Sequence, residues 1–268
     1  MNKRLSRKHF VYIIGALGII SVLIIGILLS PRSLKEPIRV GFLGEFSAHF
    51  ADWTIACRDG AVLRIEEINA TGGIQGRAIE LIVKDADEFK DDPTKAVDQL
   101  VQAGVVAIIG PISSTAAMQI VPYANSKHIL LVSPSASTNA LSNQDDFLIR
   151  VTQTQVQHSR IMATYLFEKL GWRKITGTFT TMNRTFVEEV FNSLKDKFEQ
   201  LGGRVILGEL ISENADSTSV ARSLVKDHPD GIFVVGHALA VANMCQELRK
   251  IGALYQIATS GVEHIHRI

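Results

Sequence analysis

Short apolar runs alternate with longer segments of helical periodicity along residues 38–261 of the chain. The short runs predict strands, and apolar residues that recur every three to four positions predict the helices between them. Regular alternation with short connections is typical of parallel sheets that are covered by helices on both faces. The predicted strands are 38–44, 78–87, 105–110, 128–133, 147–151, 174–179, 204–210, 231–236 and 255–261, and the predicted helices are 59–73, 92–104, 114–127, 156–170, 185–201, 217–227 and 239–252.

Glycine and capping residues support several of these boundaries. Gly72 and Gly73 end the first predicted helix, and Asp92 with Pro93 predicts an N-cap and a first helical position for the second. The strands are too many for one small sheet, so we expect an α/β protein with two Rossmann-like lobes. Short polar residues interrupt the alternation at 150–155, which predicts a first lobe of residues 38–150 and a second lobe of residues 151–268.

The start of the chain has a different pattern. Residues 11–29 are nineteen positions without a charge, and four cations stand among residues 1–10. A helix of this length comes close to spanning the bilayer core of about 30 Å, and the cations place residues 1–10 in the cytoplasm. We therefore expect an N-terminal transmembrane helix that anchors the protein facing the periplasm or the cell exterior, followed by a polar linker at 30–37. A cleaved signal peptide is the alternative, although "LLSPRS" offers no small-x-small cleavage site.

Composition and charge narrow the class of protein. The chain has 268 residues, 46% of them hydrophobic and 21% charged, which indicates a packed globular protein. Its formal net charge is +1, but residues 38–268 carry 22 basic and 26 acidic side chains. A mildly acidic body argues against nucleic acid as a partner. Only Cys57 and Cys245 could form a disulfide, and we expect two buried free thiols instead.

Two hydroxyl-rich loops carry the candidate chemistry. "GPISST" (110–115) follows one predicted strand, and "SPSAST" (133–138) follows the next. Ligands of open parallel sheets bind beyond the carboxyl ends of the strands, and helix N-termini there favour anions. Serine and threonine add neutral donors, which suits a small carboxylate. Helix capping is the better explanation of either loop alone, since these residues are preferred caps. Two such loops on neighbouring strands make the two explanations about equal.

Three stretches of the sequence together resemble the type I periplasmic binding proteins. They are residues 38–87, which contain "INATGGIQGR", and the loops "IIGPISST" and "LLVSPSAST". The most similar branch is that of the branched-chain amino-acid binding proteins of ABC transporters. This resemblance implies two Rossmann-like lobes that are joined by a hinge and close on a ligand. Members of the family are longer and return to the first lobe after the region that matches "IATSG". We therefore expect a chain that is truncated at its C-terminus or completed by a partner, with an apolar edge of the first lobe exposed.

The same resemblance implies where the ligand is held. The carboxylate would be bound by hydroxyls and backbone N–H groups of the two loops, and aromatic or polar side chains would contact the rest of the ligand. An acid that pairs with a ligand amino group would lie near Glu263, without clear alignment, so amino acids, amides, hydroxy acids and aromatic acids all stay open. For Trp53 and for His237, ordinary packing is the alternative. The implied ligand-binding residues are Ser114, Ala136 (backbone N–H), Ser137, Thr138, Trp53, Phe186, which stands at a family tyrosine position, and His237.

The resulting prediction is a solute-binding protein that captures a small carboxylate for an ABC transporter permease. A membrane-tethered sensory domain is the alternative. An enzyme is not expected, because the sequence has neither a G-x-S-x-G elbow nor a Walker A motif. His264 and His266 have H-x-H spacing without an evident third ligand, so we assign neither a metal nor a cofactor nor a catalytic residue.

Overall fold

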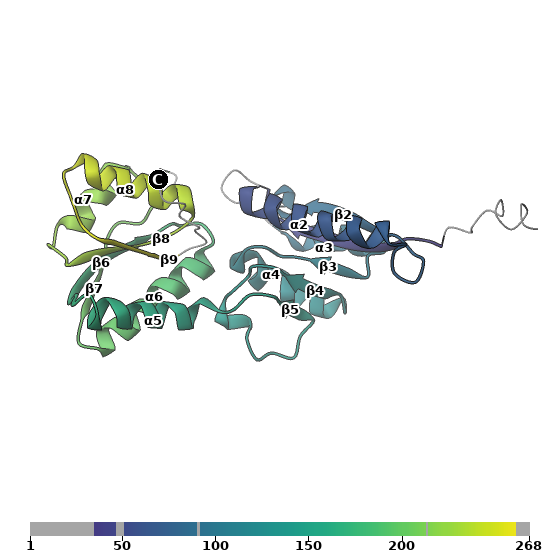
Figure 1. Cartoon of the computed structure of the whole chain (residues 1–268), viewed down its shortest axis with the longest axis horizontal. Coiled ribbons are helices and arrows are strands. Elements are labelled where there is room, and N and C mark those ends of the chain that lie inside the picture. The colour runs from purple at the N-terminus through teal and green to yellow at the C-terminus, as the bar shows by residue number, and fades with distance from the viewer. Residues whose placement is uncertain (1–34, 47–50, 90–91, 213, 261–268) are drawn as a thin grey trace, which may run out of the picture.

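A computed structural model describes residues 35–46, 51–89, 92–212 and 214–260 of the chain (Figure 1). Within these ranges no helix combines the length and the apolar character needed to cross a bilayer. The predicted membrane span at 11–29 lies outside the described residues, as do Glu263, His264 and His266.

The first lobe is a parallel sheet of five strands in the order β2-β1-β3-β4-β5. Its strands are β1 (Ile38–Gly44), β2 (Ile79–Asp85), β3 (Ala107–Ile109), β4 (Leu130–Ser133) and β5 (Leu148–Arg150). Its helices are α2 (Ala51–Ala70), α3 (Thr94–Gln102) and α4 (Ser114–Ser126), with the short 3₁₀ turns η1 (Ala86–Phe89) and η2 (Asn139–Leu141).

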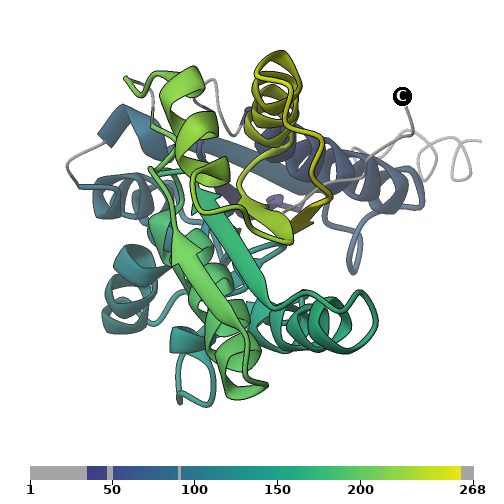
Figure 2. The same cartoon turned by 90° about the vertical axis from the view of Figure 1, so that its left-hand side faces the viewer.

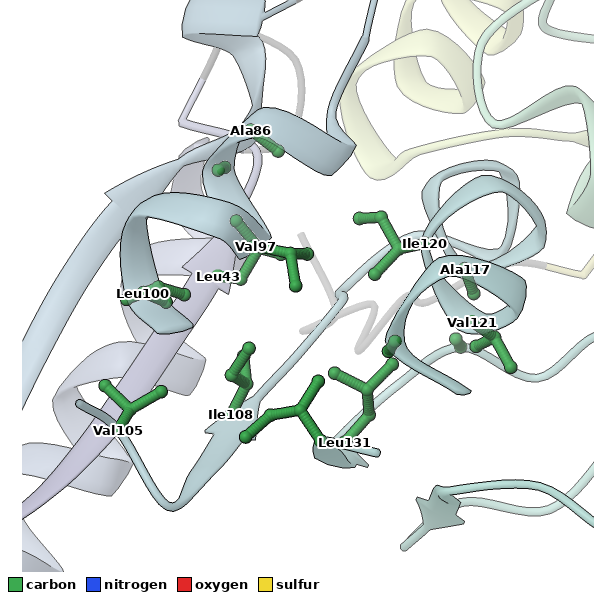
Figure 3. Packing of buried hydrophobic residues seen from close by; sticks show 14 of the residues in the cluster. Leu43, Ala86, Val97, Leu100, Val105, Ile108, Ala117, Ile120, Val121 and Leu131 are labelled. Carbon is green, nitrogen blue, oxygen red and sulfur yellow. The ribbon is translucent and has the colours of Figure 1, made fainter. Parts of the chain in front are cut away.

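One apolar layer holds this lobe together. Leu43, Ile108 and Leu131 point from three neighbouring strands toward α3 and α4 (Figure 3). Leu100 of α3 and Ile120 of α4 meet them, and all five side chains have 0% exposure. Since burial of a large aliphatic side chain contributes roughly 1.5–3 kcal/mol, this layer fixes both helices on the sheet and thereby sets where α4 begins.

The second lobe is a parallel sheet of four strands in the order β7-β6-β8-β9. The chain enters this lobe after β5, and α5 is its first helix. Its strands are β6 (Lys174–Phe179), β7 (Arg204–Leu207), β8 (Gly231–Val235) and β9 (Ile257–Ser260), and its helices are α5 (Gln155–Glu168), α6 (Arg184–Gln200), α7 (Ser217–Val225) and α8 (Ala238–Lys250).

Strand β8 shows why a continuous apolar run forms the centre of this lobe. Successive side chains of a strand point to opposite faces. Phe233 and Val235 pack in the cluster formed with α5 and α6, whereas Ile232 and Val234 pack with α7 and α8. In Figure 2, where this lobe faces the viewer, helices lie on both sides of the strands. Every residue of β8 is buried, as expected for a strand that is covered on both faces.

The predicted alternation of strands and helices is confirmed, although several element boundaries differ from the predicted ones. Helix α2 begins at Ala51, well before the predicted start at residue 59, because its N-terminal residues pack against the end of β1 through Thr54. Helix α3 begins at Thr94 instead of Pro93, and Asp92 Oδ1 accepts a hydrogen bond from the Thr94 N–H at 3.2 Å.

Strand β5 stands at one edge of the first sheet and exposes apolar side chains, as expected from the sequence. Ile149 is 52% exposed, and Val151 just beyond the strand is 69% exposed. Cys57 and Cys245 are thiols without a disulfide, and each is half-buried instead of buried.

Replacing Gly177 by alanine should destabilise the second lobe. A Cβ atom there would lie 2.6 Å from Phe191 Cε2 and 2.9 Å from the Phe233 carbonyl oxygen, and overpacking of this kind costs about 1–3 kcal/mol. Gly60→Ala is the matched control, because a Cβ on this helical glycine meets nothing within 4 Å and alanine favours the helix. Urea unfolding should place the midpoint of Gly177→Ala below wild type and that of Gly60→Ala at or above it. Equal midpoints for the two variants would show that β6 does not pack as described.

Candidate functional site

The two hydroxyl-rich loops lie against each other at the carboxyl edge of the first sheet. Strands β3 and β4 are parallel neighbours, so their loops leave the sheet side by side. The Ser137 N–H donates to Ser114 Oγ at 3.2 Å. Ser133 Oγ donates to the Pro111 carbonyl at 2.6 Å, and Ser135 Oγ donates to the Ile112 carbonyl at 2.7 Å. Three hydrogen bonds therefore join the loops into one unit.

Gly110 lets the first loop pass close to β1. Its φ of +127° lies in the region that favours glycine. A Cβ atom at this position would lie 2.1 Å from the Leu43 carbonyl oxygen. The glycine at the end of β3 thus permits the approach that places Ser113 and Ser114 over the sheet edge.

The N-terminus of α4 faces the second lobe. Ser113 is its N-cap, and Ser113 Oγ accepts from the Ala116 N–H at 3.1 Å. The Thr115 N–H donates to Asn183 Oδ1, in the second lobe, at 3.1 Å, and the Thr185 N–H donates back to Thr115 Oγ1 at 3.2 Å. These bonds join the start of α4 to the start of α6.

A further hydrogen bond joins the lobes beyond the second loop. The Asn139 N–H donates to Glu189 Oε1 at 2.7 Å. Behind this loop, Arg150 Nη1 donates to the Thr138 carbonyl at 2.5 Å and Arg150 Nη2 donates to Ser142 Oγ at 2.7 Å. Arg150 therefore supports the second loop from the sheet, and Glu189 of α6 bonds to it from the second lobe.

The predicted first-lobe residues differ in which of their hydrogen-bonding groups already have a partner within the protein. Ser114 Oγ accepts from Ser137, which leaves the hydroxyl proton of Ser114 as a donor. The Ala136 N–H already donates to Ser133 Oγ at 3.0 Å, so a ligand would have to share it. Thr138 Oγ1 accepts from the Ala140 N–H at 3.2 Å and caps η2. Ser114, Ser137 and Thr138 are brought together, at 1%, 3% and 1% exposure.

Trp53 lies near the start of α2. The neighbouring Thr54 hydroxyl donates to the Glu45 carbonyl at 2.6 Å and fixes the helix against the end of β1. The Trp53 side chain is half-buried and hydrogen bonds to Cys57, one turn further along α2. Burial raises the pKa of the Cys57 thiol, so this cysteine stays protonated at neutral pH.

The two predicted second-lobe residues differ in placement. His237, at the N-cap position of α8, lines a pocket of about 190 Å³ together with Thr180, Met182 and Asn243. This pocket lies at the carboxyl ends of β6 and β8, where the strand-end rule places ligand contacts. Phe186 is 8% exposed and packs in the apolar core of the second lobe, which places its ring among core residues.

Another pocket, of about 440 Å³, lies between α5 and β9 and contains none of the predicted site residues. It is lined mainly by apolar side chains such as Met162, Leu170 and Trp172. Its polar lining residues are Tyr165 and Gln256, and it has no serine or threonine among the lining residues, unlike the two loops. In the part of the chain that the structure describes, no cluster of three or more His, Cys, Asp or Glu residues is placed to hold a metal ion.

Glu45 is a further residue at this edge of the sheet. It directly follows β1, is 8% exposed, and its carboxyl group hydrogen bonds to Ser113. Burial raises the pKa of Glu45, although the bonds from Ser113 act in the opposite direction. The strand-end rule could have indicated it, because Glu45 stands directly after a predicted strand as the serine loops do. Its burial has no signal in the sequence.

Comparison with known proteins shows a clear relationship. Residues 37–265 match the family model described as "Periplasmic binding protein". The Leu/Ile/Val-binding protein of Escherichia coli K12 is 24% identical over 250 residues, which are 90% of this chain and 66% of the relative.

Solved structures show the same fold. The branched-chain amino acid transporter substrate-binding protein of Streptococcus pneumoniae, in complex with isoleucine, has a TM-score of 0.72 at 26% identity and covers 83% of this chain. A Rhodopseudomonas palustris solute-binding protein of an ABC transporter, in complex with 3,4-dihydroxybenzoic acid, has a TM-score of 0.70 at 21% identity and covers 84%. The match takes in 64% and 61% of those two chains, so this chain spans about two thirds of the length of its relatives or less.

Asn183→Gly should loosen the contact between the lobes. The substitution removes the amide that accepts from the Thr115 N–H, and glycine keeps the φ of +46° at this position. The Asn183 side chain does not cap its own helix, so α6 should persist. We expect hydrogen exchange at the Thr115 amide to be about 2- to 10-fold faster, as for loss of one hydrogen bond. Asn183→Asp keeps the acceptor and should exchange like wild type; equal rates for all three proteins would contradict this bridge.

Proposed function

Since the chain belongs to the periplasmic binding protein family, we propose that it is an extracytoplasmic solute-binding protein that captures a small carboxylate for an ABC transporter. The ligand class that fits best is an amino acid or a related compound. The protein binds and releases this ligand without chemical change and needs no cofactor. Residues 11–29 hold it at the membrane, and the permease receives the ligand.

The hydrogen bond between the Ser137 N–H and Ser114 Oγ carries this proposal. It supports the convergence of two hydroxyl loops on one crevice, where the donors of both loops are within reach of one ligand group. The N-terminus of α4 adds the positive end of a helix dipole, and Arg150 adds a positive charge behind the second loop. Neutral donors and helix dipoles together suit a carboxylate that must be both held and released.

The ligands named for the similar structures support a carboxylate rather than one particular side chain. Isoleucine and 3,4-dihydroxybenzoic acid share a carboxyl group and differ in the rest of the molecule. In this chain Ser114, Ser137 and Thr138 would hold that shared group, while Trp53 and His237 would contact the variable part. Phe186 would contribute from its place in the second-lobe core, by shaping the wall behind the site.

Closure of the two lobes couples binding to shape. The bonds from Thr115 to Asn183 and from Asn139 to Glu189 form only when the lobes are together. A ligand that contacts both lobes stabilises the same state, so its binding raises the closed population. A transporter can then distinguish loaded protein from empty protein by shape.

The first experiment is a thermal-shift screen of the full chain in a mild detergent. Amino acids, amides, hydroxy acids and aromatic acids are tested, because a ligand that binds only the folded state raises the melting temperature. The proposal expects at least one small carboxylate to raise it. A folded sample that responds to none of them would contradict the proposed function.

Ser114→Ala should weaken binding of the best ligand from this screen. The variant removes a hydroxyl that donates to a charged group, which corresponds to a loss of roughly tenfold or more in affinity. Ser126→Ala is the matched control, because Ser126 stands at the other end of α4 and its hydroxyl donates only to the Tyr123 carbonyl. Calorimetry should show weakened binding in the first variant and wild-type binding in the second. Wild-type affinity in Ser114→Ala would place the carboxylate elsewhere.

A further inference from the structure

Glu45 lies at the same edge of the sheet as the serine loops. Its backbone carbonyl accepts from the Thr54 hydroxyl at 2.6 Å, so the start of α2 holds it in place. Its carboxyl group accepts hydrogen bonds from the hydroxyl and the backbone N–H of Ser113. Ser113 directly precedes Ser114 in the chain, so the Glu45 carboxyl group is bonded to the residue next to Ser114.

One oxygen of this carboxyl group has no hydrogen-bond donor. Glu45 Oε2 is buried and makes no hydrogen bond, and the residue as a whole is 8% exposed. A buried carboxylate oxygen without a donor is unfavourable, so native proteins keep few such groups. A donor supplied by a ligand would remove this cost.

The charges around Glu45 favour a cationic donor. Asp87, on η1, acts on Glu45 electrostatically as a like charge. Asp85, at the end of β2, accepts from the backbone N–H groups of Phe46 and Asp87 at 3.2 and 2.9 Å. On α2, the Arg58 guanidinium lies 5.9 Å from the centre of the Phe46 ring. Among the described residues, the charge that acts on the Glu45 carboxyl group is thus a like charge, that of Asp87, which favours an added cation.

We propose that Glu45 is a specificity-determining residue whose Oε2 atom receives the ammonium group of a zwitterionic ligand held by its carboxylate at Ser114. A hydroxyl loop and helix N-terminus beside a buried carboxylate match the two opposite charges of an α-amino acid. An ionised Glu45 would repel a ligand that is only an anion. This inference rests on the proposed function and names within it both the ligand class and the selecting residue.

The test compares two ligands of equal shape. Calorimetry on the full chain measures the best-binding α-amino acid of the screen and its 2-hydroxy analogue, beginning with leucine and 2-hydroxy-4-methylpentanoate. In Glu45→Gln the affinity for the amino acid should fall roughly 10- to 100-fold, as for loss of a charged hydrogen bond. The affinity for the hydroxy acid should stay the same or rise, because the substitution removes the repulsion between two negative charges. Glu80→Gln is the matched control. It removes one negative charge near the start of β2, where Glu80 pairs with Arg39, and should change the affinity for either ligand by less than about threefold.

The pH profile gives a second readout. Burial raises the pKa of Glu45 above its ordinary value, with Asp87 adding to the effect. The ionised form receives the ammonium group, so amino-acid affinity should be full above this raised pKa and should decline as the pH falls through it. Glu45→Gln should lack this decline. Because ionising Glu45 in the folded state costs stability, Glu45→Gln should melt no lower than wild type at neutral pH, which checks its fold.

Other outcomes separate the two proposals. If the amino acid binds and Ser114→Ala weakens it, but Glu45→Gln weakens both ligands equally or neither, the Glu45 inference is wrong and the proposed function stands. Amino-acid affinity that stays level as the pH falls through the raised pKa of Glu45 would also overturn the inference. If neither ligand class binds the wild type, both proposals fall.

Discussion

Two parallel strands that end at the same edge of a sheet force their loops together, and the candidate site depends on this constraint. Strands β3 and β4 pair in register from Ala107 with Leu130 to Ile109 with Val132. The loops that follow them therefore lie side by side, and the Ser137 N–H donates to Ser114 Oγ. The apolar layer under α3 and α4 keeps this edge rigid, so the short hydroxyl side chains can hold a ligand group at a fixed position.

The same edge of the first sheet is also the surface on which the lobes meet. The N-terminus of α4 offers N–H groups that its own helix cannot satisfy, and one of them is bonded by Asn183 from the second lobe. Binding and closure therefore draw on neighbouring groups of one helix end. A ligand anion at Ser114 and the amide oxygen of Asn183 both place negative charge or partial charge near this end, where the helix dipole favours it. For the function that we propose, this shared attraction is a physical reason to expect a loaded site and a closed molecule together.

Much of the fold could be predicted because each buried strand is a short apolar run bounded by glycine or a polar turn. The run at 231–236 is apolar throughout because β8 is covered on both faces, and the run at 38–44 ends in the glycine that lets α2 pack closely. The strand-end rule also placed Ser114 and Ser137 correctly beside each other. These features are local or follow from the order of the strands, so a sequence carries them.

The remaining features depend on contacts between distant segments. Phe186 packs in the core and Asn183 bonds to Thr115 as results of packing, and no local pattern encodes these contacts. The burial of Glu45 is of the same kind, since α2, η1 and the loop before α4 enclose it together. Residue type and spacing identified the edge of the sheet, but not the role of each group along it.

A crystal structure of the full chain with a bound amino acid tests the central claim most directly. The account predicts that the ligand carboxylate lies within hydrogen-bond reach of Ser114 Oγ, at about 2.6–3.2 Å, between the two serine loops and the second lobe. A carboxylate bound elsewhere, such as in the pocket between α5 and β9 that Trp172 lines, would contradict it.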